Sequence, residues 1–550
     1  MQKDAILFHY LKNTSLKRTK KQKEKCEIRR NNQKQLHLSE KRNIVKIRKR
    51  LSNIKQNLKI KEEGFPMKRK IVSTILCAAM VISTMAGCGS SSSSSADAGT
   101  SDSGSSTTAN ESTASTEAAD TTDEATASSG DEGKVLNIYC WNEEFKSRIT
   151  DHYPGYTEKD ATTGTIGDVT VKWNITPNDD NAYQNNLDAT LLKQQDAAAD
   201  DKIDLFLVEA DYALKYVDTD YTMPVTDLGI TEDELSDQYQ YTKDIVTDSD
   251  GVLKGVSWQG CPGVLFYNRE AAKEVLGSDD PAEVQKAVAD WDTFNETAKT
   301  MKDAGYSMTS SVNDTYRVYS NNVSSKWVDD SGKINIDDNI MNWVEDSKAL
   351  VDAGETGTHE LWSDDWSKGF YPDGKVFCYF GPAWLVNFSM AADTEGSIGY
   401  NGGWGAAEGP QGFFWGGTWI CAANGTDSAS LVKDIILKMT TDDDIMKDIV
   451  IDDDDFVNNN EVMNGLADGT IMGKDDKPYE SKILGGQNPL EMYCAGVSNL
   501  DLSNLCAYDQ GCNEEFQHTM KNYFEGKATK DEALDLFYKA VTEKYPELTY

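Results

Sequence analysis

Alternating apolar and polar runs predict most of the secondary structure of this chain. Short runs of branched and aromatic residues, bounded by turn residues, predict strands at 134–141, 169–175, 203–209, 264–268 and 375–382. Apolar residues spaced three and four apart predict helices at 181–198, 291–305 and 529–545, and Thr529 and Glu532 form a capping box at the start of the last. Strands that alternate with helices predict an α/β fold with mainly parallel sheets.

The folded body predicted by this pattern runs from about residue 134 to residue 550. A segment of this length exceeds what one hydrophobic core usually serves. We therefore expect two lobes.

A signal-like segment begins at Met67 rather than at Met1. Three basic residues at 68–70 precede an apolar run at 71–85, which is too short to span a membrane but typical of a secretory signal peptide. The end of that run with Ala86-Gly87-Cys88 resembles the lipobox of bacterial lipoproteins. We expect residues 67–87 to be removed and Cys88 to carry a lipid; the alternative is an ordinary cleavage site with a chance cysteine.

Residues 1–66 hold 20 Lys and Arg against 6 Asp and Glu, a balance that ordinarily indicates binding to nucleic acid or an anionic membrane. A different hypothesis takes account of the signal that follows. Lys61-Glu62-Glu63-Gly64 can be encoded by codons that contain a bacterial ribosome-binding sequence, just before Met67. We expect residues 1–66 to be an untranslated leader, which a peptide from this region detected in cells would contradict.

The remaining chain is strongly acidic. The formal charge is −36 for the whole chain, +14 for residues 1–66 and +3 for residues 67–87, which leaves −53 for residues 88–550. This charge excludes nonspecific binding to nucleic acid, which requires clustered Lys and Arg. Residues 88–133 are rich in Ser, Thr, Ala and Gly and contain no aromatic residue, so we expect a disordered tether, or alternatively a glycosylated stalk.

Cysteine, histidine and acidic patterns indicate no metal or cofactor. The eight cysteines from Cys88 onward lack metal-ligand spacing, and we expect buried free thiols, with a disulfide among Cys494, Cys506 and Cys512 as the alternative. None of the five histidines lies in a zinc or triad motif. The acidic runs at 442–444 and 451–462 lack the EF-hand pattern, and we expect them to cap helices.

Ten blocks follow one another along the chain, and together they carry a family resemblance. They are the lipobox, the Ser-rich tether, KVLNIYCW, IDLFLVEADYALKYV, VLKGVSWQGCPGVLFYNREAAKEVLG, DWDTFNETAKTMKDAG, GKVFCYFGPAW, GPQGFFWGGTWICAANGTDS, DFVNN and YFEGKATKDEALDLF. In this order they resemble the extracellular solute-binding proteins of ABC transporters, specifically the carbohydrate-binding family 1 related to maltose-binding protein.

The resemblance implies a two-lobed periplasmic-binding-protein-like fold of type II, whose discontinuous lobes are joined by a hinge and close on a sugar. We expect residues 134–257 and 416–465 to form lobe 1, and residues 258–415 and 466–550 to form lobe 2.

Aromatic rings that stack on pyranose C–H faces are one requirement of a sugar site, and all 12 tryptophans lie in the body. The resemblance implies a stacking role for Trp384, in a Gly-Pro-aromatic turn. Trp258 and Gln259, at the presumed first crossover between lobes, either face the ligand or pack the hinge. At the second crossover we expect either Trp415 or Trp419 to face the ligand.

Trp404, in a glycine-rich loop, is a further candidate for ligand contact. We expect four other tryptophans to be structural because they lie in helical or pre-helical contexts: Trp291, Trp343, Trp362 and Trp366.

Carboxylates and amides that bond to sugar hydroxyls are the second requirement. Asn142, Glu143 and Glu144 follow the first predicted strand, at the edge where ligands bind in open α/β sheets. Glu209 and Asp211 follow the third predicted strand in the same way. The alternative is that these residues are solvated bystanders. Asp509, with Tyr508, is a weaker candidate.

These features predict that the protein captures a sugar and delivers it to an ABC permease. The number of tryptophans favours an oligosaccharide. The ATPase must be a separate chain because no Walker A motif occurs. The alternatives are a surface-anchored glycoside hydrolase, for which no eightfold βα pattern exists, and a binding protein for another solute. We expect no enzymatic activity, no cofactor, a monomer, and a lipid anchor on the outer face of the cytoplasmic membrane, in a Gram-positive cell.

Overall fold

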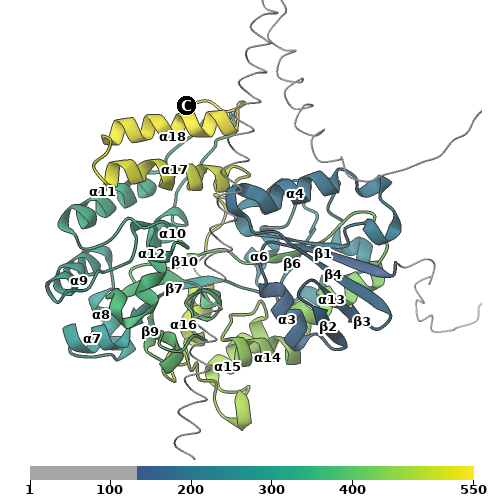
Figure 1. Cartoon of the computed structure of the whole chain (residues 1–550), viewed down its shortest axis with the longest axis horizontal. Helices are drawn as coiled ribbons and strands as arrows, with labels where there is room; N and C mark the ends of the chain where they lie inside the picture. The colour runs from purple at the N-terminus through teal and green to yellow at the C-terminus, as the bar shows by residue number, and fades with distance from the viewer. Residues whose placement is uncertain (1–132, 499) are drawn as a thin grey trace, which may run out of the picture. The chain divides into compact units, whose positions relative to one another are not determined.

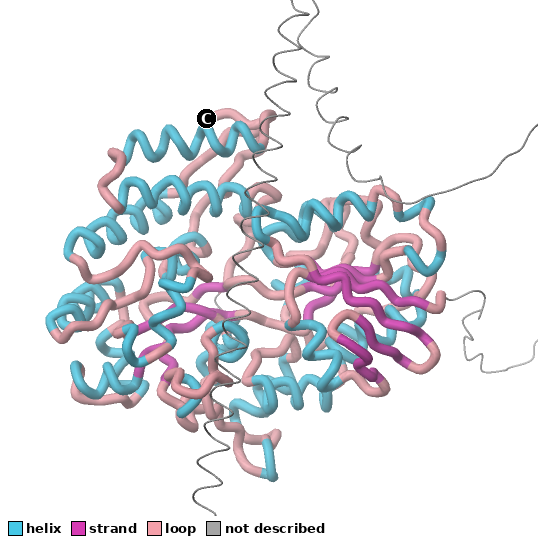
Figure 2. The backbone as a smooth tube through the Cα atoms, viewed as in Figure 1, coloured by secondary structure: helices cyan, strands magenta, loops and turns pink. Residues whose placement is uncertain are grey.

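The computed structural model describes residues 133–498 and 500–550. The expectations for the leader at 1–66, the signal peptide at 67–87, the lipid on Cys88 and nearly all of the tether at 88–133 fall outside these residues. Figure 1 follows the described chain from its first strand to the C-terminal helices, and Figure 2 shows its strands gathered in two groups.

The larger sheet has seven strands in the order β2-β3-β4-β1-β5-β11-β6. Their bounds are β1 Val135–Cys140, β2 Tyr156–Asp160, β3 Thr163–Ile166, β4 Val169–Ile175, β5 Leu205–Val208, β6 Val256–Ser257 and β11 Trp419–Ala422. Six of these strands come from one stretch of chain, and β11 is inserted between β5 and β6 from a segment more than 150 residues later.

The prediction of mainly parallel sheets is wrong. Only β1 pairs in parallel, with β4 and β5, whereas the other neighbouring strands of the larger sheet are antiparallel. Parallel neighbours need a long crossover, but short turns join β2, β3 and β4 into an antiparallel meander. β11 arrives from a distant segment, so no crossover helix fixes its direction.

Helices cover both faces of the larger sheet, which explains why β1 and β5 read as continuous apolar runs. One face packs against α3 (Glu144–His152), α13 (Ala429–Thr441) and α14 (Asp443–Asp453). The other face packs against α4 (Ala182–Leu191) and α5 (Ala213–Val217). Figure 1 shows α4 on one side of the sheet and α3 with α13 on the other.

The smaller sheet is centred on β7 (Pro262–Asn268), which pairs antiparallel with three strands. These are β8 (Cys378–Gly381), β9 (Trp404–Ala407) and β10 (Phe413–Phe414). α7 (Arg269–Val275), α8 (Pro281–Ala287) and α9 (Trp291–Asp303) pack against it.

A separate apolar cluster joins four helices near the C-terminus: α10 (Tyr316–Ser320), α11 (Asp338–Ala353), α17 (Asp509–Phe524) and α18 (Lys530–Lys544). The remaining α-helices of the described residues are α6 (Gln240–Asp244), α12 (Asp364–Ser367), α15 (Asn460–Asp468) and α16 (Leu490–Val497). No helix within residues 133–498 and 500–550 is long and apolar enough to cross a membrane.

Several local predictions are confirmed. The capping box of α18 forms between Thr529 and Glu532. The side chains of Asp442 and Asn459 cap α14 and α15, so both acidic runs contain helix caps. The seven described cysteines are free, so the alternative of a disulfide among Cys494, Cys506 and Cys512 is wrong. Five of the seven are buried as expected, whereas Cys494 and Cys506 are only partly buried.

Candidate ligand-binding site

A cavity of about 470 Å³ lies where segments that follow the two sheets meet. Residues beyond strands of the larger sheet line one side: Trp141, Asn142, Glu144, Asn178, Glu209, Asp211 and Tyr212. Two segments link the sheets, the first link at 258–261 and the second link at 415–418. They contribute Gln259, Trp415, Gly416, Gly417 and Thr418 to the lining. The other side consists of Asn313, Arg317, Leu361, Trp362, Trp384, Phe388 and Ser389, with Gln510, Asn513, Glu514 and Gln517 from α17.

Four of the predicted polar residues, Asn142, Glu144, Glu209 and Asp211, line this cavity. They follow β1 and β5, which are hydrogen-bonded neighbours, so their side chains emerge at the same edge of the sheet. The side chain of Asn142 accepts a hydrogen bond from the backbone N–H of Glu144 at 3.1 Å, which fixes its orientation at the start of α3.

Glu143, by contrast, does not line the cavity. Its side chain is 62% exposed and lies 3.4 Å from the Lys146 ammonium, one turn along α3. The helix turns the next residue, Glu144, toward the cavity instead. The structure therefore gives no support to Glu143 as a ligand contact.

Glu144 and Gln259 both line the cavity and are hydrogen-bonded to each other. Gln259 Nε2 donates to Glu144 Oε1 at 2.8 Å and to Asp455 Oδ2 at 3.1 Å. Gln259 lies in the first link between the sheets, so this amide joins α3, the link and the end of α14. Both alternatives for Gln259 hold in part, because the residue lines the cavity and also packs the crossover.

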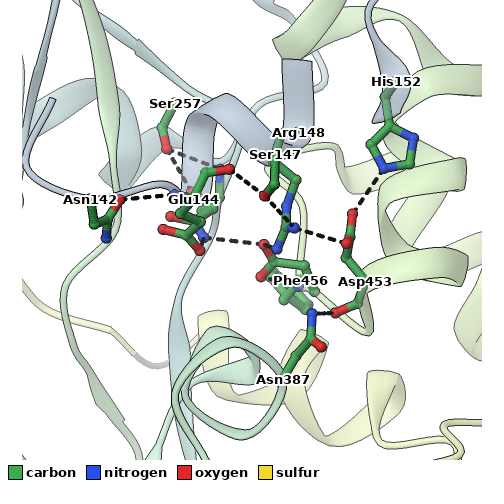
Figure 3. A network of polar contacts seen from close by, with 11 residues as sticks. Asn142, Glu144, Ser147, Arg148, His152, Ser257, Asn387, Asp453 and Phe456 are labelled. Atoms are coloured by element: carbon green, nitrogen blue, oxygen red, sulfur yellow. Dashed lines mark hydrogen bonds and ion pairs between the residues drawn. The ribbon is translucent and has the colours of Figure 1, made fainter. Parts of the chain in front are cut away.

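A polar network continues from Glu144 away from the cavity (Figure 3). Arg148 lies 2.8 Å from Asp453 and 3.4 Å from Asp455, and His152 lies 2.8 Å from Asp453. Asn387, from the segment after β8, donates to the Asp453 carbonyl. Burial raises the pKa of Glu144 to about 7, against the opposing charge of Arg148.

Arg317 of α10 holds Asp211 in a two-bond ion pair across the cavity. Arg317 Nη1 donates to Asp211 Oδ1 at 2.9 Å, and Nη2 donates to Oδ2. The planar guanidinium matches a carboxylate in this way. Asp211 follows β5 of the larger sheet, and Arg317 lies in α10, which follows the helix α9 that packs on the smaller sheet. The ion pair therefore joins the two sides of the cavity.

Three tryptophans form one wall. The ring centroids of Trp384 and Trp415 lie 5.2 Å apart, and Trp362 lies 6.2 Å from Trp384 and 5.7 Å from Trp415. Trp384 Nε1 donates to the Trp415 carbonyl at 3.3 Å, which couples the turn after β8 to the second link. Trp384 and Trp415 are predicted residues, whereas Trp362 was expected to be structural, yet its side chain lines the cavity and is 54% exposed.

Three other predicted tryptophans lie in the core. Trp258, Trp404 and Trp419 are 0% exposed and do not line the cavity. Trp258 stacks on Phe145 at 5.1 Å, Trp404 packs edge-on against Tyr379, and Trp419 Nε1 donates to the Thr242 carbonyl. All three belong to or adjoin β6, β9 or β11, strands whose residues are buried on both faces, so these rings lie in the core. None of the three therefore belongs to the cavity lining, and Trp258 fits the alternative of packing at the crossover.

Sequence reasoning missed several cavity residues. The α17 residues Gln510, Asn513, Glu514 and Gln517 have the i, i+3, i+4, i+7 spacing of one helix face, and this spacing could have identified them. The weaker candidate Asp509, beside them, points elsewhere: it is buried and accepts a hydrogen bond from the Cys506 backbone. Arg317 and Asn178 lie in loops and short helices and carry no such signal.

Comparison with known proteins gives a family and a fold. A family model described as bacterial extracellular solute-binding protein matches residues 158–468, more than half of the chain. A search of curated proteins found no match.

Many solved structures share the fold at low sequence identity. A binding protein associated with an ABC transporter of B. animalis subsp. lactis, in complex with β-1,6-galactobiose, is 19% identical, with a TM-score of 0.55 over 76% of this chain and 99% of that chain. The galacto-N-biose-/lacto-N-biose I-binding protein of Bifidobacterium longum is 16% identical, with a TM-score of 0.55 over 76% and 98%. Maltose-bound MalE3 of T. maritima is 15% identical, with a TM-score of 0.53 over 74% and 99%.

Proposed function

Because this chain belongs to the family of bacterial extracellular solute-binding proteins, we propose that it captures a sugar, and specifically an oligosaccharide, for an ABC importer. The three structures named above were solved with, or are named for, sugars: β-1,6-galactobiose, lacto-N-biose and maltose. Their identity to this chain is too low to transfer a ligand, but they support the choice of sugars as the first class to test.

The observation that carries the proposal is the composition of the cavity. Trp362, Trp384 and Trp415 offer ring faces for pyranose C–H groups, and the opposite side offers carboxylates and amides for hydroxyls. A volume of about 470 Å³ lies within the range of small-molecule sites, which is about 300 to 1,000 Å³.

Capture in this proposal involves two lobes that close on the ligand. We assign residues 134–257 and 416–465 to lobe 1, and residues 258–415 and 466–550 to lobe 2. The division follows the two sheets, and the links at 258–261 and 415–418 then serve as hinges. A ligand that contacts both sides favours the closed form by the contacts it makes only there.

Delivery requires partners outside this chain. The closed protein would dock on permease subunits, whose ATPase is a separate chain. In the same proposal residues 67–87 direct secretion, Cys88 carries the lipid anchor, and residues 88–133 let the monomeric body stand clear of the outer face of the cytoplasmic membrane, as the sequence predicts for a Gram-positive cell.

A thermal-shift screen of the intact chain against mono- and oligosaccharides, peptides and polyamines tests the proposal. A ligand that binds only the folded state at a hundred times its dissociation constant stabilises it by about 2.7 kcal/mol. We expect a shift with one sugar series and recovery of that sugar unchanged. A thermal shift with peptides alone would contradict the proposal that the ligand is a sugar, and cleavage of the sugar would contradict a transport role.

A further inference from the structure

One corner of the cavity contains polar atoms whose hydrogen-bonding capacity is largely unused. Tyr212 is 5% exposed and lines the cavity, yet its hydroxyl has no hydrogen-bond partner among the described residues. Beside it, the carboxylate of Glu209 accepts a hydrogen bond from the backbone N–H of Asp211 at 3.0 Å, and no other bond to it occurs among the described residues. A carboxylate has about four acceptor positions, so most of its capacity remains available to a ligand.

The charge of the cavity lining is unbalanced. Glu144, Glu209, Asp211 and Glu514 supply four carboxylates, and Arg317 is the one basic side chain among the residues that line the cavity. Arg317 is already committed to Asp211 through both terminal nitrogens. Burial, with the neighbouring Asp211, raises the pKa of Glu209 well above its ordinary value, although Arg317 opposes this.

An aromatic ring closes the same corner. Trp141 contacts the Tyr212 ring edge-on, with centroids 6.3 Å apart, and also lines the cavity. Indole faces attract cations within about 6 Å of the ring centroid. Carboxylate, free hydroxyl and indole face together match an ammonium group, which donates three hydrogen bonds and carries a positive charge.

We propose that the ligand carries a cationic amino group, as an amino sugar does, and that Glu209 and the Tyr212 hydroxyl bind this group beside Trp141. The inference rests on the proposed sugar-binding function and narrows its substrate class. An ammonium favours the ionised form of Glu209, which burial otherwise disfavours, and makes a charge-assisted hydrogen bond with it, whereas a neutral hydroxyl makes only the weaker uncharged bond. An acidic sugar meets repulsion from Glu209 and finds Arg317 already occupied.

Matched sugars test the inference directly. Glucosamine- and galactosamine-containing disaccharides in several linkages would each be compared by calorimetry at pH 7 with the N-acetylated and hydroxyl forms of the same disaccharide. The intact chain should bind the amine at least tenfold more tightly than either counterpart. Spermidine and choline would be included as cations without a sugar.

Three variants locate the effect. Glu209→Gln should weaken binding of the amine at least tenfold more than it weakens binding of the neutral sugar, and Tyr212→Phe should weaken binding of the amine less than Glu209→Gln does. Glu296→Gln makes the same change of charge at an exposed position on α9, outside the cavity, and should leave both affinities unchanged. Melting temperatures without ligand would check that each variant is folded.

Each outcome bears on the proposal. Tighter binding of neutral sugars, or amine binding that is unaffected by Glu209→Gln, would overturn the proposal of a cationic ligand but leave the proposed sugar-binding function standing. Binding of spermidine or choline, with no binding of any sugar, would contradict the proposal that the ligand is a sugar and would support a cationic ligand of another class. A panel in which nothing binds would contradict both.

Discussion

Glu144 is a carboxyl that the fold buries at the edge of the cavity, where its charge is costly. It is 6% exposed and accepts a hydrogen bond from Gln259, and burial raises its pKa from 4.5 to about 7. The folded state therefore binds a proton that the unfolded state has released between these two values. Stability must fall as pH rises through this window.

Glu144→Gln should remove this cost. A shift of this size corresponds to a few kcal/mol, on the order of 3, when the group is fully ionised. The unfolding free energy of the variant relative to the parent should rise from pH 5 to pH 8, as measured by urea denaturation at each pH. Glu296→Gln is the exposed control and should give a flat difference; a flat difference for Glu144→Gln as well would contradict the buried carboxyl.

Burial also divides the tryptophans into two groups that ought to respond differently to substitution. Trp362 is 54% exposed at the cavity wall, with a φ of 67°, whereas Trp404 is 0% exposed in the core. Trp362→Ala should lower the unfolding free energy little and weaken ligand binding by about 1 kcal/mol or more. Trp404→Ala should cost about 3 to 5 kcal/mol of stability and affect affinity little. Melting curves and calorimetric titrations measure both, and a Trp362 variant with unchanged affinity would remove this ring from the site.

At the scale of elements, the cavity depends on contacts between segments that follow different sheets. The ion pair of Asp211 with Arg317 joins the turn after β5 to α10, and both side chains are largely buried, at 13% and 17% exposure. The second link is equally constrained: Gly416 has a φ of 70°, and a Cβ there would lie 3.1 Å from the Trp384 ring. The ion pair and the backbone of the second link therefore both fix the position of one side of the cavity relative to the other.

Breaking this ion pair from one side should be costly, because it leaves a buried charge without its partner. Arg317→Gln should lower the unfolding free energy by about 3 kcal/mol, and the double variant Asp211→Asn/Arg317→Gln should recover much of the loss. Lys286→Gln breaks the exposed pair with Glu283 and should cost less than about 1 kcal/mol. Equal losses at both pairs, in urea titrations, would show that Asp211 and Arg317 are no more than a surface contact.

Elements with strong apolar patterns could be predicted from the sequence, and contacts between distant segments could not. The strand β4 matches its predicted range, and the caps of α14, α15 and α18 form as expected. The polar hairpin β2–β3 was missed because its residues have little apolar alternation. Trp404 and Trp419 were misplaced because tertiary packing buries both faces of β9 and β11, and Arg317 reaches Asp211 only through tertiary folding.

For the whole molecule, the family and the fold agree with a protein that binds a solute outside the cell. The charge of −53 over residues 88–550 is compatible with solubility and also favours attraction of cationic over anionic ligands. Segments that adjoin strands of both sheets line the cavity together with α17, so a ligand there contacts residues that are far apart in the sequence.

The most direct test of sugar capture is a calorimetric titration of the intact chain, and of its Trp384→Ala variant, with the sugar that gives the largest thermal shift. Chromatography of the recovered sugar would accompany it. We predict saturable binding of one sugar per chain, recovery of the sugar intact, and at least fivefold weaker binding by the variant. Absence of saturable binding, cleavage of the sugar, or equal affinity in the variant would contradict capture of a sugar in this cavity.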